Sequence, residues 1–177
     1  MSTGIRIRKG ASISLIGESD KILSDASPSK TFALKPDNFF GIIPRLMVKE
    51  GESIALGAPV FHSKKDPRIL FVSPVSGVVK EIVRGAKRKI LKIVIEKKQG
   101  EVVAHKIPSL DSLDREKVTE ILLNSGAWPF IKQRPYGIVA QPDVIPKAIY
   151  VSSYASAPLD VDFQFLLKNN KEDFQKG

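Results

Sequence analysis

The sequence predicts a mainly β domain, followed by one amphipathic helix and then the start of an α/β domain. Across Leu46–Glu96, short apolar segments are separated by glycine and proline, which is typical of a small sandwich or barrel. Residues 109–125 change to helical periodicity, and residues 147–152 resemble a buried strand that opens an α/β unit. We therefore expect three regions: a β domain over 1–105, a helical connector over 106–135 and a truncated second domain over 136–177.

The β domain has a strand pattern from its first residues. Ile5–Arg8 alternates apolar and basic side chains, which predicts a strand with one face in solvent. Thr31–Leu34 predicts another strand, and the β-branched segment Ile90–Ile95 predicts the last long one. Gly51 and Gly77 follow polar residues between apolar segments, so we expect both at positive φ in tight reversals.

The helix has a predicted start, buried face and end. Asp114 is a suitable N-cap, because a short carboxylate can accept from the free N–H groups of the first turn. Val118, Ile121 and Leu122 fall on one face at helical spacing, and Gly126 is placed to end the helix.

The segment 147–152 is the strand that should open the second domain. No segment that could serve as its crossover helix follows, and a parallel-type strand without one is an incomplete unit. We therefore expect the chain to be the N-terminal part of a longer protein.

Composition excludes several function classes. The 177 residues contain no cysteine, which excludes disulfides, thiolate nucleophiles and cysteine-held iron–sulfur clusters. No apolar run has the length of a membrane-spanning helix, and charges occupy the place of a signal peptide's apolar region. We expect a cytoplasmic protein without a transmembrane segment.

The net charge of +9 is unevenly distributed. Residues 1–105 hold 19 Lys and Arg against 10 Asp and Glu, whereas residues 106–177 hold 9 of each. The densest basic cluster lies between two predicted strands and consists of Arg84, Lys87, Arg88 and Lys89. A solvated turn is the favoured interpretation, and docking to an anionic membrane or an acidic partner is the second. Nucleic acid is not expected, because no aromatic residues are interleaved with the cluster.

Two aromatic segments are candidates for recognition. Phe39 and Phe40 are adjacent, so in extended chain one ring faces away from the core, either covered by another layer or free for a flat ligand or partner. Trp128, Phe130 and Tyr136 lie close to Arg134. They form either a recognition surface or the filling of a seam between domains.

Residues that could carry chemistry are scarce. His62 and His105 have no further ligand at metal-binding spacing, and the glycines form no phosphate-binding loop. We expect no catalytic residue and no metal site. The residues alone predict a binding or assembly module.

Within the β domain, the segments Val48–Phe61 and Ser73–Ile82 resemble the two half-motifs of biotinyl/lipoyl-type domains, which implies a barrel-sandwich hybrid fold. Such carriers present a modified lysine on the hairpin between the half-motifs, which here is His62–Arg68. Lys64 and Lys65 are its lysines, but they lie a residue or two too far from Ser73 and lack a flanking methionine. A carrier modified at one of them is the alternative function.

The whole chain resembles the A subunit of the bacterial sodium-translocating NADH:quinone reductase. The resemblance rests on Ile7–Gly10, Arg45–Gly51, Phe61–Arg68, Ser73–Gly77, Arg84–Arg88, Ser125–Trp128, Arg134–Tyr136 and Ala157–Asp160. It implies that the second domain is Rossmann-like. It also implies a peripheral protein on the inner face of the bacterial membrane, in a complex that passes electrons from NADH to quinone and exports Na⁺.

The resemblance also implies where cofactors and partners lie. NADH, FAD, FMN, riboflavin and the 2Fe-2S cluster belong to other subunits, and this fragment alone is not expected to catalyse. Related flavoprotein subunits carry a glycine-rich flavin loop, and the comparable stretch here is Gly126–Ile131. Only one glycine remains in it and Trp128 would crowd a flavin phosphate. For contact with quinone or a neighbouring protein of the complex, the candidates are Phe39, Phe40, Trp128, Phe130 and Tyr136 for ring contacts and Arg134 as donor to a carbonyl.

Overall fold

The computed structural model describes residues 16, 20–106, 108–109, 112–152 and 160–176. The strand expected over Ile5–Arg8 lies outside the described residues. Contacts within the chain divide it into one unit of residues 27–145 and another formed by residues 1–26 and 146–177. Each unit is described by itself below.

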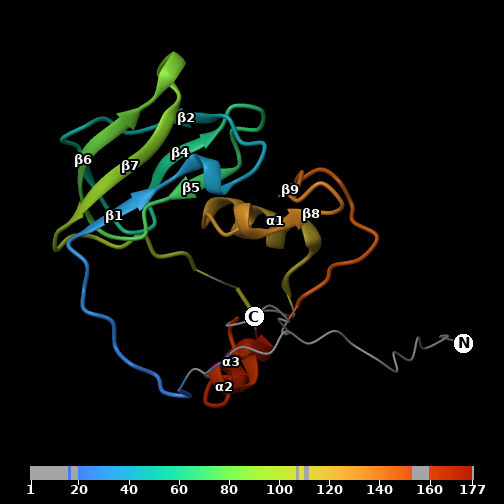
Figure 1. Ribbon diagram of the computed structural model, residues 1–177. Helices are drawn as coiled ribbons and strands as arrows, with labels where there is room; N and C mark the ends of the chain where they lie inside the picture. Colours follow the sequence, from blue (N-terminus) through green and yellow to red (C-terminus); the bar gives the residue numbers. More distant parts are fainter. Residues whose placement is uncertain (1–15, 17–19, 107, 110–111, 153–159, 177) are drawn as a thin grey trace, which may run out of the picture. The chain divides into compact units, whose positions relative to one another are not determined.

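The first unit consists mainly of two antiparallel sheets, as the sequence predicts (Figure 1). The four-stranded sheet has the order β1 (Thr31–Leu34), β7 (Ile90–Lys97), β6 (Gly77–Arg84) and β3 (Ser53–Ile54). The three-stranded sheet has the order β2 (Pro44–Leu46), β4 (Pro59–Ser63) and β5 (Leu70–Val72). The predicted strands at 31–34 and 90–95 are therefore confirmed.

The core is built from the inner faces of both sheets. In β7, Ile90, Ile93 and Ile95 are buried while Leu91 between them is exposed. Val60 and Phe61 of β4 are fully buried as well. Full burial of each such side chain stabilises the fold by about 1.5–3 kcal/mol.

Gly51 and Gly77 are needed for different reasons. Gly51 has φ +82°, as predicted for a tight reversal, and its N–H donates to Val79 O (2.7 Å). The positive φ predicted for Gly77 is wrong. Gly77 is instead the first residue of β6, where a Cβ would collide with the backbone carbonyl of Glu96 on β7. Glycine is required at this position because β6 and β7 approach each other too closely for a side chain.

The predicted helix is confirmed as α1 (Arg115–Asn124). Asp114 caps it by accepting from the Lys117 N–H (2.8 Å), and Gly126 ends it at φ +73°. A Cβ on Gly126 would lie 2.6 Å from a methyl group of Val72, so the chain after α1 packs directly on β5. The one-turn helix η4 (Trp128–Phe130) and the hairpin of β8 (Lys132–Gln133) and β9 (Ile138–Val139) follow.

The second unit is described over only part of its length. The strand predicted over 147–152 is wrong: the backbone there is irregular and the side chains of Ile149, Tyr150 and Val151 are exposed. The chain then forms the short helices α2 (Phe163–Leu166) and α3 (Lys171–Lys176). Lys21 and Asp162 form an ion pair at 3.0 Å.

Among the described residues, no helix has both the length and the apolar character needed to cross a membrane.

The different roles of Gly51 and Gly77 lead to a stability prediction. We expect Gly77→Ala to lower the free energy of unfolding by more than about 3 kcal/mol, because β6 must separate from β7 to admit the methyl group. Gly51→Ala should lower the free energy of unfolding by only about 1–2 kcal/mol. The alanine would be strained by the positive φ, but no atom lies within 4 Å of the added Cβ. Urea unfolding of both variants provides the measurement. Equal losses would contradict the steric role of Gly77.

Candidate functional site

A column of phenylalanine rings runs from the core to the surface. Phe61 stacks on Phe71 with centroids 4.4 Å apart, and Phe71 meets Phe39 edge-to-face at 4.7 Å. Phe39 in turn meets Phe130 edge-to-face at 6.0 Å. Such pairs contribute about 0.5–1.5 kcal/mol each beyond burial. The exposed fraction rises from 0% at Phe61 to 74% at Phe130, so a surface ring rests on a buried stack.

Phe130 forms the outer end of this column, and two further exposed rings lie on chain segments near it. Phe40, Phe130 and Tyr136 are 71%, 74% and 71% exposed, and together we call them the aromatic surface. Gly41, next to Phe40, packs against Ile138 of β9, with 3.4 Å between its built Cβ and the Ile138 side chain. The chain segment of Phe40 therefore lies against the β8–β9 hairpin, whose turn carries Tyr136 and the exposed Arg134.

The two adjacent phenylalanines separate as expected. Phe39 points into the molecule and Phe40 away from it. With 71% of its surface exposed, Phe40 is not covered by another layer of the described structure.

Trp128 is placed differently from the other candidates. It is 8% exposed, and its indole N–H donates to the Ala140 carbonyl at 2.8 Å. Trp128 thus fills the interior of the first unit, whereas Phe130 and Tyr136 face solvent, and their role in recognition stays a prediction.

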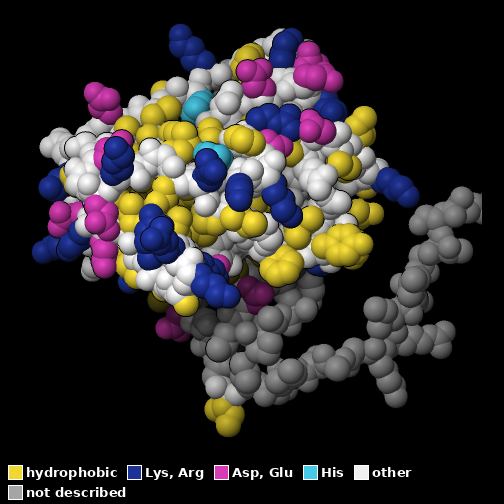
Figure 2. All heavy atoms as spheres, turned by 90° about the horizontal axis from the view of Figure 1, so that it is seen from above, with side chains coloured by type: hydrophobic (Ala, Val, Ile, Leu, Met, Phe, Trp, Pro, Cys, Tyr) yellow, Lys and Arg dark blue, Asp and Glu magenta, His cyan; other side chains and the backbone are white. Residues whose placement is uncertain are grey.

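Sequence reasoning missed an exposed apolar strip formed by the residues that flank the edge strand β2. Ile43 and Met47 are 53% and 47% exposed and alternate with the exposed Arg45, while Ile42, Leu46 and Val48 face inward. The alternation of period two across residues 42–48 was the signal that could have revealed this face. Figure 2 shows hydrophobic side chains mixed with Lys and Arg over one whole face of the molecule.

The basic cluster forms the turn between β6 and β7, which agrees with the favoured interpretation of a solvated turn. Arg84, Lys87, Arg88 and Lys89 are all exposed. Lys89 pairs with Asp37 at 2.7 Å.

The β4–β5 loop, which carries the lysine in biotinyl/lipoyl carriers, is held by an ion-pair cluster. The Arg68 guanidinium donates to Asp66 (Nη2–Oδ2, 2.7 Å) and to both carboxylate oxygens of Asp143 (2.9 and 2.7 Å). These hydrogen bonds lower the pKa of Asp66 and of Asp143 and raise the pKa of Arg68. Lys64 and Lys65 are exposed beside this cluster. The cluster fastens the loop to the segment that follows β9.

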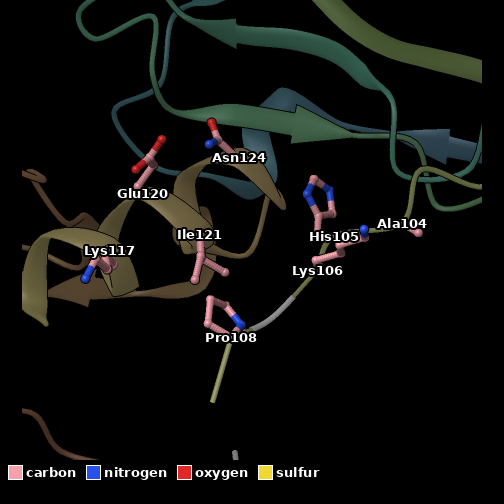
Figure 3. A pocket seen from close by; sticks show the side chains of 8 residues that line it. All are labelled: Ala104, His105, Lys106, Pro108, Lys117, Glu120, Ile121 and Asn124. Carbon is pink, nitrogen blue, oxygen red and sulfur yellow. The ribbon is translucent and has the colours of Figure 1, made fainter. Parts of the chain in front are cut away.

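A shallow cavity of about 380 Å³ lies between α1 and the segment before it (Figure 3). Lys117, Glu120, Ile121 and Asn124 of α1 line one side, and His105 lies on the other. The lining mixes both charges with apolar surface. No group of three or more His, Asp or Glu side chains within the described part of the chain could hold a metal ion.

The Arg68 cluster gives a pH prediction. The folded pKa values of Asp66 and Asp143 lie below their usual value, so the stability they contribute is present above about pH 4 and is lost as pH falls through the lowered values. We expect Arg68→Gln to lower the urea midpoint at pH 7, and the difference from wild type to shrink steadily below about pH 4.

Asp143→Asn is the matched variant that removes one carboxylate charge of the same cluster. It should show a smaller decrease with the same pH trend. A difference between wild type and Arg68→Gln that stays constant from pH 7 to pH 2 would contradict the role of these ion pairs.

Comparison with known proteins identifies the family. Residues 5–98 match the family model described as the NqrA N-terminal barrel-sandwich hybrid domain, and residues 113–177 match the NqrA second alpha/beta domain. These matches confirm the predicted fold class. The domain boundaries expected near residues 105 and 135 stay a prediction.

The names of curated relatives agree with these family matches. The chain is 34% identical over 98% of its length to the A subunit of the Na(+)-translocating NADH-quinone reductase of Photorhabdus laumondii, of which it covers 39%. Relatives with the same name from Tolumonas auensis and Histophilus somni are 33% and 31% identical, each 40% covered. The chain thus spans about 40% of the length of these relatives. The family models match both parts of the chain in order, and we conclude that the chain belongs to the NqrA family.

Proposed function

We propose that this chain forms the N-terminal part of the NqrA subunit in a Na⁺-translocating NADH:quinone reductase. The complex would couple electron transfer from NADH to ubiquinone or menaquinone with Na⁺ export. The observation that carries the proposal is the match of both NqrA domains, in order, over 5–98 and 113–177. We place the protein on the cytoplasmic side, peripheral to the membrane and bound to the other subunits of the complex.

Within that complex, we assign the redox cofactors to other subunits. The chain has no cysteine to ligate a 2Fe-2S cluster. The stretch that corresponds to the flavin loop of related subunits is Gly126–Ile131, and its residues do not fit a flavin phosphate. The N–H groups of Gly126, Ala127, Phe130 and Ile131 all donate to carbonyls within the chain, and Gly126 packs on Val72. In the proposed complex, other subunits would hold the 2Fe-2S cluster and FMN, together with NADH, FAD, riboflavin and the catalytic steps.

The role that we assign to this part of the protein is contact, either with quinone or with a neighbouring subunit. A quinone presents a flat ring and two carbonyl acceptors. Phe40, Phe130 and Tyr136 offer ring faces and edges, and Arg134 in the same turn as Tyr136 can donate to a carbonyl. Phe39 supports Phe130 from below, so the contact ring is already held in place before binding.

Ring contact can be tested through Trp128, the only tryptophan of the chain. Titration with a soluble quinone analogue should quench or shift its fluorescence, because Trp128 lies in the same one-turn helix as Phe130. We expect Phe130→Ala to lower the affinity for the analogue, measured from the fluorescence change, about tenfold. This corresponds to the loss of one ring contact.

Val118→Ala provides the control, since it removes a partly exposed apolar side chain of α1. It should leave the response unchanged. Equal responses in wild type and Phe130→Ala would contradict the assignment of the aromatic surface to quinone.

The assignment to the complex has its own test. A tagged form of the full-length protein that contains this chain should co-purify from bacterial membranes with NADH:quinone reductase activity that depends on Na⁺. Purification without such activity would overturn the proposed function.

The carrier alternative keeps one supporting observation, the exposure of Lys64 and Lys65 on the β4–β5 loop. Because Arg68 fastens this loop to Asp143, we expect the intact mass of protein purified from cells to equal the unmodified mass. A covalent adduct on either lysine would favour the carrier.

A further inference from the structure

The turn between β6 and β7 has a backbone conformation that is unusual for lysine and arginine. Lys87 and Arg88 occupy its two central positions at φ 53° and 59°, and the Lys89 N–H closes it on the Ala86 carbonyl at 3.1 Å. Two-residue hairpin turns with positive φ at both positions strongly favour Asn-Gly, because longer L side chains are strained there. The chain thus carries two long cations where a less strained turn is available. Backbone strain of this kind clusters at functional sites.

Three cations of this turn, Arg84, Lys87 and Arg88, have no acidic partner in the described part of the chain, whereas Lys89 pairs with Asp37. Arg84 donates to the Arg88 carbonyl at 3.4 Å, which holds its side chain along the turn. Within the described structure, no carboxylate lies within 4.0 Å of the charged groups of Arg84, Lys87 or Arg88. Of the acidic groups nearby, Asp37 pairs with Lys89, Glu50 accepts from the Ile82 N–H at 2.6 Å, and Glu81 lies three residues before Arg84 on β6. Three charges therefore project into solvent.

The shape of the turn limits what it can bind. In Figure 1 the β6–β7 hairpin extends beyond its neighbouring strands and ends in this turn, so the charged surface is convex. Leu91, 40% exposed, lies beside it, 3.1 Å from a Cβ built on Gly85. A stable protein interface needs about 800 Å² on each partner, which a single convex turn does not provide. An anionic lipid surface requires no shape fit, because its potential acts over a Debye length, and it can accept one apolar side chain at its boundary.

We propose that the β6–β7 turn is a membrane-contact point, in which Arg84, Lys87 and Arg88 bind the headgroups of anionic phospholipids and Leu91 rests at the lipid boundary. The inference rests on the turn alone and not on the proposed function. Each cation near an anionic surface raises the binding constant about fivefold, so removal of all three should weaken binding on the order of 100-fold.

Strain in the turn allows a variant that loses charge without losing stability. Arg84→Gln, Lys87→Asn and Arg88→Gly together remove three charges and create the favoured Asn-Gly turn. We expect a Tm equal to or roughly 2–6 °C above wild type. Failure to fold is therefore not the expected explanation for lost binding.

The control removes the same charge from the other end of the same hairpin. Lys97 pairs with Gly77 at the end of the ladder opposite Arg84, and Lys30 and Lys98 adjoin it. With seven residue pairs from Gly77 to Arg84, the two ends are about 20 Å apart. The control variant is Lys30→Gln, Lys97→Gln and Lys98→Gln.

Co-sedimentation of the full 177-residue chain with vesicles is the measurement. Wild type and the control should bind vesicles of phosphatidylglycerol and phosphatidylcholine, and none of the proteins should bind phosphatidylcholine alone. The turn variant should lose about 100-fold in affinity for the anionic vesicles. Equal losses in both variants, or no binding by wild type, would overturn the proposal. A matching loss of binding to duplex DNA by the turn variant would also overturn it, because the turn would then be a general polyanion contact.

Discussion

The pairing of β7 with β6 is the interaction on which the rest of the first unit depends. β7 is hydrogen-bonded on both edges, to β1 and to β6, and its inward residues Ile93 and Ile95 are fully buried. A shift of register by one residue would turn both side chains to solvent. The approach of Gly77 to the Glu96 carbonyl fixes the ladder at one end. Two register shifts, after Val79 and after Val83, then lie between this end and the turn.

The aromatic surface depends on the core in a comparable way. Phe71 is buried between Phe61 and Phe39, and Phe39 connects this stack to Phe130. A surface ring supported in this manner loses little conformational freedom on binding, which favours contact with a flat partner. Trp128 contributes from below, because its hydrogen bond to Ala140 ties η4 to the chain that follows β9.

Local signals in the sequence were sufficient for the strands at Thr31–Leu34 and Ile90–Ile95 and for α1, since spacing and capping by Asp114 act within a few residues. Signals that depend on distant contacts were not sufficient. The requirement for Gly77 comes from a strand partner 19 residues later, at Glu96, and no local pattern distinguishes it from a turn glycine. Residues 147–152 have an apolar composition suited to a strand, but a strand also needs a paired neighbour.

The distribution of charge shows how the β4–β5 loop differs from the β6–β7 turn. The β4–β5 loop is anchored, because Asp66 and Asp143 surround Arg68 and hold the loop to a distant segment. In the β6–β7 turn only Lys89 is paired among the described side chains, through Asp37, and the remaining cations lie at a backbone conformation that an Asn-Gly pair would adopt with less strain. Pairing neutralises charge where the chain must be held in place. In the β6–β7 turn, three cations without a described acidic partner lie together where the hairpin projects (Figure 1).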